Sequence, residues 1–202
     1  LGASKNKYKL DPGSKLLAGV KYFPLRKEFL SFARNARPQP NEATRILVAI
    51  GGGNVARLNQ QVVQALASLE CDELEVRVLG DLDGAGDLAV PVEIIHYASD
   101  MPGLIAWADC AIIGSGLMRY EVAYIGTPSI VFSLNAEHKR MVEDFAETGA
   151  VISGGMFSDS SRTTMTAAIR GLLKDKSLRD KMAAIGPKLI DGKGASRLVV
   201  AI

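Results

Sequence analysis

The fold is decided by the stretch Ile46-Leu47-Val48-Ala49-Ile50-Gly51-Gly52-Gly53-Asn54. The apolar residues 46–50 have the length of a strand. They do not alternate with polar residues, as they would in a strand that faces water on one side. Three glycines then favour a tight turn, and an amphipathic helical pattern follows from Val55. A buried strand, a glycine turn and a helix form the repeating unit of parallel α/β sheets.

The same alternation of strand and helix continues to the end of the chain. The expected strands are Ile46–Ile50, Leu74–Leu79, Val92–Tyr97, Cys110–Ile113, Ser129–Ser133 and, more weakly patterned, Ala150–Ser153. The expected helices are Val55–Leu69, Met101–Ala108, Leu117–Ile125, Ala136–Glu147, Arg162–Leu173, Ser177–Ala184 and Ala195–Ile202. This order predicts an α/β fold: a Rossmann-like, doubly wound parallel sheet of about six strands.

Residues 1–44 form a different region, which we call the linker segment. Prolines at positions 12, 24, 38 and 40 interrupt it, and only a short helix near 25–34 is expected. Its first 40 residues hold nine Lys and Arg against two acidic residues. A basic arm can bind nucleic acid, but this one has no arginine-rich block, so a solvated linker is favoured. We therefore divide the chain into the linker segment and a nucleotide-binding domain, residues 45–202.

Composition limits the class of protein. The apolar fraction of 48% and the charged fraction of 23% are those of a globular protein. No run of eighteen apolar residues occurs, so no transmembrane segment is expected. Cys71 and Cys110 lack metal-ligand spacing, and Cys110 lies in an apolar run where a buried, inert thiol is expected. This cysteine usage fits a reducing cytoplasm, and no metal or other cofactor is implied.

Two glycine turns are expected to meet at one edge of the sheet. In the strand order 3-2-1-4-5-6 the first and fourth strands are neighbours, and ligands bind where the order reverses. Each turn precedes a helix whose first N–H groups are unpaired, and glycine allows a ligand to approach the backbone closely. The alternative is that each glycine only permits a tight turn. The predicted diphosphate ligands are Gly52, Gly53, Asn54, Ser115, Gly116 and Leu117.

The first turn also matches the dinucleotide pattern G-x-G-x-x-A from Gly51 to Ala56. A nicotinamide dinucleotide site needs an acid at the end of the second strand, about twenty residues on. Asp81 and Asp83 come later than that, so the pattern neither excludes nor favours such a site. An NAD-type or standalone nucleotide-binding module without catalysis stays open as the alternative function.

Glu121 lies one turn into the helix that begins after Gly116. A carboxylate accepts both hydrogen bonds of a vicinal diol, and a ribose diol lies at about this distance from a nucleotide's diphosphate. Taken alone, the residue is better explained as an ordinary acid near a helix N-terminus, where the helix dipole favours negative charge.

The stretch Gly114-Ser115-Gly116-Leu117-Met118-Arg119-Tyr120-Glu121-Val122-Ala123-Tyr124-Ile125-Gly126-Thr127-Pro128 resembles the signature of GT-B enzymes that bind nucleotide sugars. The nearest likeness is to UDP-sugar hydrolases of pseudaminic acid biosynthesis and their spore-coat polysaccharide relatives, and a more distant one is to the peptidoglycan N-acetylglucosaminyltransferase. Residues 16–29, 46–54 and 191–197 agree with the hydrolase group, in which the first of these stretches links two domains.

The resemblance implies a set of contacts to a UDP-sugar. Glu121 would bind the ribose diol, and the two glycine turns would bind the diphosphate. His96, Ala98 and Met101 would border the base, although His96 by itself fits a hydrogen-bonded packing residue better. Asn135 and His138 would contact the sugar or a phosphate, against the alternative that Asn135 only caps a helix.

The resemblance also implies that a histidine in a separate N-terminal domain serves as the general base. No residue of this chain corresponds to it, so the catalytic residues stay unknown and that domain is expected to be missing. The chain would then be the nucleotide-sugar-binding half of a hydrolase or glycosyltransferase in surface-polysaccharide or nonulosonic acid synthesis. Its expected partners are the nucleotide sugar and the missing domain, not nucleic acid.

Overall fold

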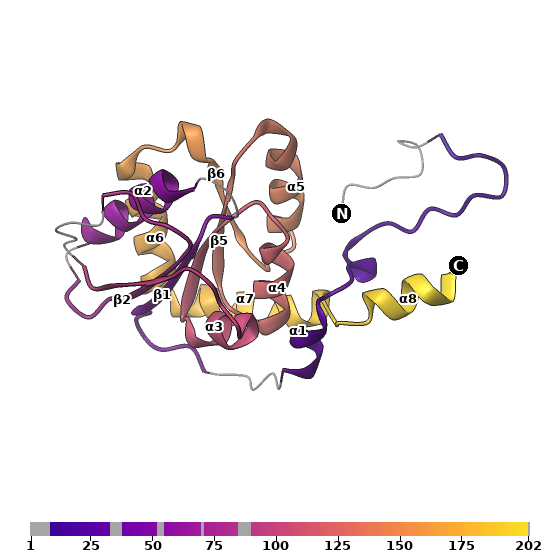
Figure 1. Ribbon diagram of the computed structural model, residues 1–202, viewed down its shortest axis with the longest axis horizontal. Helices are drawn as coiled ribbons and strands as arrows, with labels where there is room; N and C mark the ends of the chain where they lie inside the picture. Colours follow the sequence, from indigo (N-terminus) through magenta and orange to yellow (C-terminus); the bar gives the residue numbers. More distant parts are fainter. Residues whose placement is uncertain (1–8, 33–37, 52–54, 70, 85–89, 202) are drawn as a thin grey trace.

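The protein, seen here as a computed structural model, contains one parallel sheet of six strands in the order β3-β2-β1-β4-β5-β6 (Figure 1). The structure describes residues 9–32, 38–51, 55–69, 71–84 and 90–201. The strands are β1 (Arg45–Ala49), β2 (Glu75–Leu79), β3 (Val92–Ile95), β4 (Cys110–Gly114), β5 (Ser129–Ser133) and β6 (Ile152–Met156). The predicted doubly wound α/β fold is confirmed, and the order reverses between β1 and β4.

Helices cover both faces of the sheet. α2 and α6 lie together on one face, and α3, α4 and α5 lie on the other (Figure 1). The helices are α1 (Lys27–Ser31), α2 (Ala56–Ala67), α3 (Met101–Trp107), α4 (Met118–Ile125), α5 (Ala136–Ala146), α6 (Arg162–Lys174), α7 (Lys176–Leu189) and α8 (Gly194–Ala201). Two short 3-10 turns are η2 (Val20–Tyr22) and η3 (Phe157–Asp159). No described helix has the length and apolar character to cross a bilayer.

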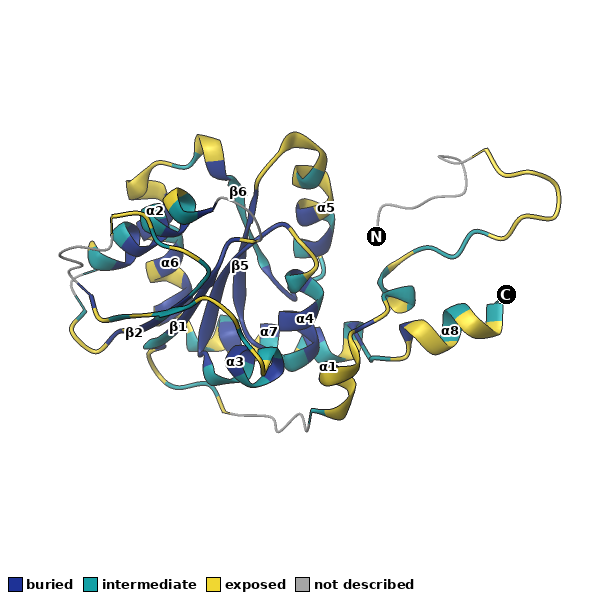
Figure 2. Cartoon of the chain, viewed as in Figure 1, coloured by how far each residue is buried: buried dark blue, intermediate teal, exposed yellow. Residues whose placement is uncertain are grey.

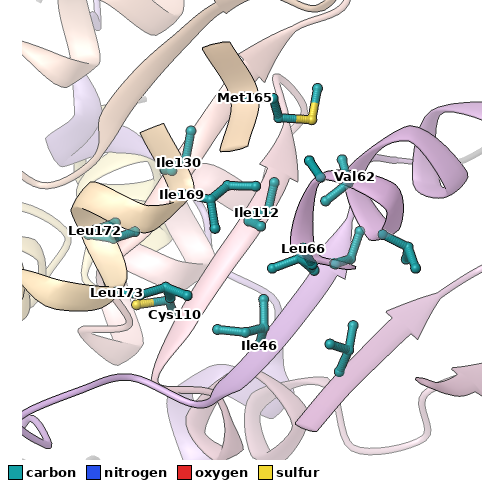
Figure 3. Packing of buried hydrophobic residues seen from close by; sticks show 14 of the residues in the cluster. Ile46, Val62, Leu66, Cys110, Ile112, Ile130, Met165, Ile169, Leu172 and Leu173 are labelled. Carbon is teal, nitrogen blue, oxygen red and sulfur yellow. The ribbon is translucent and has the colours of Figure 1, made fainter. Parts of the chain in front are cut away.

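The central strands carry the core because their side chains alternate between the two faces. Ile46 lies in one cluster with Leu66 of α2 and Ile169 of α6 (Figure 3), whereas Leu47 belongs to the cluster on the opposite face. The strands therefore appear buried along their length in Figure 2. Cys110 is 1% exposed, and burial raises the pKa of its thiol above the usual range. The thiol stays protonated, as the sequence predicted.

The linker segment is partly built into this core. Phe29 of α1 is fully buried and Leu25 nearly so, both against the cluster that holds α3 and α4. Residues that precede the predicted division at residue 44 therefore contribute to the core. Beyond the sheet, α8 runs alongside η2, where Arg197 donates a 2.9 Å hydrogen bond to the carbonyl of Lys21 (Figure 1).

Two elements extend several residues beyond the ends that the sequence predicts. β6 begins at Ile152 and continues to Met156, because pairing with β5 extends the strand through Gly154 and Gly155 despite their low strand propensity. α7 continues past Ala184 to Leu189, with Pro187 in its last turn. A Cβ atom at Gly186 would lie 2.4 Å from the carbonyl oxygen of Ala123, so this glycine lets α7 pack directly on α4. Tertiary packing thus overrides local propensity at both places.

Candidate functional site

A cavity of about 630 Å³ opens where β1, β2 and β3 end, beside the point at which the strand order reverses. Ligands of open α/β sheets bind at this edge. Its lining residues are Arg26, Glu28, Ala49, Gly51, Val55, Leu79, Gly80, Asp81, His96, Tyr97, Ala98, Ser99, Met101 and Met118. A second cavity of about 550 Å³ lies beside Asp109 and Thr127, which precede β4 and β5, and contains none of the predicted site residues.

The ends of β1 and β4 meet as the sequence predicted. The two strands pair in parallel from Ile46 with Cys110 to Ala49 with Ile113. A Cβ atom at Gly114 would lie 1.8 Å from the carbonyl oxygen of Ile50, so glycine is needed where the strand ends touch. The predicted ligands Gly52, Gly53 and Asn54 lie outside the described residues.

Ser115 connects the second glycine turn to α5. The residue is 1% exposed, and its hydroxyl lies 2.8 Å from Nδ1 of His138. The backbone N–H of Leu134 also donates to this hydroxyl, at 3.3 Å. The Ser115 side chain therefore orients the imidazole of His138, while Gly116 and Leu117 are exposed beyond it. Of the three predicted phosphate ligands of this turn, Ser115 is thus in direct contact with His138.

Asn135 begins α5 as its N-cap. Its side-chain oxygen accepts a 2.9 Å hydrogen bond from the backbone N–H of His138. Asn135 therefore caps the helix, which was the alternative to a sugar or phosphate contact. His138 lies in the first turn of the helix and is partly buried. Cap and serine together fix the position of the imidazole next to the glycine turn.

Glu121 is held by a residue that the sequence analysis did not single out. Its side chain is 8% exposed, and its Oε1 accepts a 2.9 Å hydrogen bond from Nε of Arg26. Arg26 lines the cavity and also pairs with Glu28 at 2.8 Å. Partial burial lowers the pKa of Arg26, but its hydrogen bond to Glu121 and the charges of both glutamates outweigh this and raise it. The ion pair brings the linker segment to the predicted ribose ligand.

The only signal for Arg26 was its place in residues 16–29, which the resemblance assigned to the linker. Nothing in the local pattern connects it to Glu121, 95 residues further along the chain.

The three residues predicted to border the base also line the cavity. Ala98 and Met101 follow β3, as does His96, whose Nδ1 lies 3.0 Å from Oδ1 of Asp81. His96 is thus hydrogen-bonded, as the interpretation as a hydrogen-bonded packing residue expects, but its side chain is 74% exposed and does not pack in the core. β3 ends at Ile95, two residues before the predicted end, and this leaves the imidazole outside the sheet. Tyr97 is 84% exposed at the same place.

The described part of the site offers groups for binding a polyanion and a diol: exposed N–H groups of a glycine turn, an imidazole, a guanidinium and a buried carboxylate. Among the described residues, no group of three or more His, Cys, Asp or Glu side chains is placed to hold a metal ion. Ser115 and His138 are in contact, but no described carboxylate orients the imidazole as a nucleophilic triad would require.

Comparison with known proteins finds similarities both in sequence and in fold. No family model matches the chain. It is 25% identical over 206 residues to the spore coat polysaccharide biosynthesis protein SpsG of Bacillus subtilis, covering 98% of this chain and 60% of that protein. It is 30% identical over 195 residues to the UDP-N-acetylglucosamine–N-acetylmuramyl-(pentapeptide) pyrophosphoryl-undecaprenol N-acetylglucosamine transferase of Symbiobacterium thermophilum, covering 87% of this chain and 50% of that enzyme.

The crystal structure of MurG from Acinetobacter baumannii superimposes with a TM-score of 0.68 and 22% identity, over 83% of this chain and 51% of that one. At this identity the likeness shows the fold alone, which is that of a GT-B glycosyltransferase domain. The chain thus spans about half the length of the relatives it matches.

Proposed function

We propose that this domain belongs to an enzyme of bacterial polysaccharide synthesis and binds the nucleoside diphosphate part of its nucleotide sugar. The preferred nucleoside diphosphate is UDP. The observation that carries the proposal is the buried carboxylate of Glu121. It lies one turn from the glycine turn at Ser115-Gly116, with Arg26 linking it to the 630 Å³ cavity.

The ribose would bind at Glu121. A carboxylate has about four lone-pair sites on its two oxygens, so the bond from Arg26 leaves acceptor capacity for both hydroxyls of a ribose diol. Because Glu121 is 92% buried, any hydrogen bond it makes is shielded from competing water. The base would then extend toward Ala98 and Met101, which border the same cavity.

The diphosphate would bind between Arg26 and the glycine turn. The N–H groups that precede α4 carry the positive end of its dipole, and Arg26 supplies a full positive charge. His138, held by Ser115 and by the cap at Asn135, would reach the sugar-proximal phosphate or the sugar itself. We place Gly52, Gly53 and Asn54 at the same diphosphate. No metal ion is needed for this set of contacts.

The reaction itself would be completed outside these 202 residues. Water or an acceptor hydroxyl must lose a proton as it attacks the anomeric carbon, and this needs a general base. We place that base in an N-terminal domain of the parent protein, and we favour hydrolysis of a UDP-sugar in nonulosonic acid synthesis over glycosyl transfer. The likeness to SpsG over 98% of this chain supports a surface-polysaccharide pathway. A free, buried Cys110 agrees with a cytoplasmic location.

One observation favours the alternative, a nicotinamide dinucleotide site. Asp81 lines the cavity two residues beyond β2, close to the strand end that carries the ribose-binding acid in dinucleotide-binding domains. Its side chain is 79% exposed and bonded to His96, however, whereas Glu121 is buried. The two functions therefore place the ribose on different carboxylates.

Calorimetric titration of the 202-residue chain with UDP, GDP and NAD tests the proposal. We expect micromolar affinity for UDP, weaker binding of GDP and little binding of NAD. Glu121→Ala should abolish UDP binding. Glu75→Gln is the matched control, because this exposed glutamate begins β2 and so lies at the end of the strands opposite to the site. Binding of NAD alone, lost in Asp81→Asn and retained in Glu121→Ala, would refute the proposal in favour of the alternative.

A further inference from the structure

Arg119 of α4 is a buried cation beside the glycine turn. The residue is 5% exposed, and its Nη1 donates to the carbonyl oxygens of Ser115 at 2.5 Å and Gly116 at 2.7 Å. Its Nη2 donates to the hydroxyl of Tyr120 at 2.8 Å. Within the described residues, no carboxylate forms an ion pair with it. Among the described residues, carbonyl and hydroxyl dipoles and the ring of Tyr120 therefore face its positive charge.

These two hydrogen bonds fix the direction of two peptide units. The C=O and N–H of a planar trans peptide point in opposite directions, and the described chain contains no cis peptide. Since the carbonyls of Ser115 and Gly116 point toward Arg119, the N–H groups of Gly116 and Leu117 point away from it. Both of these residues are exposed, and no described residue accepts a hydrogen bond from either N–H.

Aromatic packing holds the guanidinium in this position. Arg119 lies over the ring of Tyr120, 4.3 Å from its centroid. That ring contacts Phe23 of the linker segment at 4.3 Å and Phe145 of α5 at 5.1 Å between centroids. The side chain is therefore fixed by three segments of the chain, and the glycine turn depends on all of them.

We propose that Arg119 is a positioning residue of the diphosphate site. It draws two carbonyls of the glycine turn inward, so that the N–H groups of Gly116 and Leu117 face the phosphates, and it places a positive charge behind them. This inference rests on the proposed function. It goes further by giving Arg119, which is not among the proposed ligands of the nucleotide, a role in binding. Donors fixed before the ligand arrives bind an anion without a cost of reorganisation.

Arg179 provides a matched comparison. It is fully buried on α7 and likewise donates to backbone carbonyls, those of Leu172, Leu173, Pro40 and Asn41. It interacts electrostatically with Cys110, which begins β4, and so lies at the edge of the sheet opposite Ser115. Losing Arg179 should lower stability without affecting the site, which separates a general loss of packing from a specific effect.

The test is a titration of the ¹⁵N-labelled 202-residue chain with UDP, uridine and inorganic pyrophosphate. In the wild type, we expect UDP and pyrophosphate to shift the amide resonances of Gly116 and Leu117. In Arg119→Met, UDP affinity should fall about 10- to 100-fold, the loss expected for hydrogen bonds to charged groups, while uridine affinity changes by less than about threefold. Arg119→Lys should recover part of the loss, and Arg179→Met should keep the wild-type ratio of UDP to uridine affinity.

Equal losses of UDP and uridine affinity in Arg119→Met, or no loss of either, would overturn the inference and leave the proposed function intact. Absence of UDP binding by the wild type would instead overturn the proposed function, and the inference with it. If Arg119→Met does not fold, Tyr120→Phe removes only the hydroxyl that accepts from the same guanidinium. That variant should lower UDP affinity about threefold and leave uridine affinity unchanged, and an unchanged UDP affinity would count against the inference.

Discussion

Replacing Glu121 by glutamine tests whether its carboxylate binds the ribose. The substitution keeps the size of the side chain and removes its charge. The glutamine carbonyl oxygen can still accept hydrogen bonds, but the NH₂ group that replaces the second carboxylate oxygen cannot. The hydrogen bonds to the ribose diol should therefore be weakened, because the acceptor that remains is neutral. The perturbation is therefore confined to the charge and acceptor atoms of one side chain, which is 92% buried.

The magnitude follows from the strength of a hydrogen bond to a charged group, about 1.5 to 3 kcal/mol. With about 1.4 kcal/mol for each tenfold change in affinity, the wild type should bind UDP about 10- to 150-fold more tightly than 2′-deoxy-UDP. In Glu121→Gln this discrimination should shrink to about 2- to 10-fold, because a neutral hydrogen bond contributes only about 0.5 to 1.5 kcal/mol.

Stability should change little in the same variant. Arg26, the partner of Glu121, is 49% exposed, and a pair with one solvated member stabilises the fold by about 0 to 1 kcal/mol. Glutamine also avoids the desolvation of a buried charge, which offsets part of this loss. A weaker affinity in Glu121→Gln would therefore not result from unfolding.

Isothermal titration of UDP and 2′-deoxy-UDP into both proteins measures the four affinities, and thermal unfolding measures the stability. Equal binding of the two ligands by the wild type would refute the assignment of the ribose to Glu121. So would a preference for UDP that is undiminished in the variant, since another residue would then bind the 2′-hydroxyl. Glu75→Gln should reproduce the wild-type values in every measurement.

Four further predictions follow from the packing. Gly116→Ala should fold with wild-type stability, because the added Cβ would have no neighbour within 4 Å. The same Cβ should obstruct the phosphate and weaken UDP binding about tenfold or more, which calorimetry would measure. Phe29→Ala should lower the free energy of unfolding in urea by about 3 to 5 kcal/mol, since the ring is fully buried. A thiol reagent should modify Cys71 in the native protein, and Cys110 only after denaturation, because burial raises the pKa of that thiol. Arg197 of α8 donates hydrogen bonds to the carboxylate of Asp191 and lowers the pKa of Asp191 from 3.8 to about 2. This carboxylate therefore contributes fully to stability above about pH 4, and the contribution is lost as the pH falls toward 2.

Each of these predictions has a defined contrary result. Unchanged UDP affinity in Gly116→Ala would show that no phosphate approaches the turn. A loss below about 1 kcal/mol in Phe29→Ala would mean that the linker segment does not contribute to the core. Modification of both thiols in the native protein would contradict the burial of Cys110. For Asp191, acid titration of Asp191→Asn should lack the loss of stability between pH 4 and 2, and an unchanged acid profile would refute the assignment.

The sequence by itself determined the class of fold, and it predicted the place of the candidate site. Apolar runs without alternation identify strands buried on both faces, and the glycines after β1 and β4 mark where those strands end. These signals lie within about ten residues of one another, so local pattern and backbone sterics are enough to interpret them. The rule that ligands bind where the strand order reverses then predicts where on the sheet the candidate site lies.

Only the tertiary structure decided which side chains meet at that site. Arg26 lies 95 residues before Glu121, and Ser115 lies 23 residues before His138, so each contact depends on how separate elements pack. The same reason explains why α7 continues through Pro187. Local propensity cannot encode a partner that reaches a residue from elsewhere in the chain, because the energy of such contacts arises only when the core assembles.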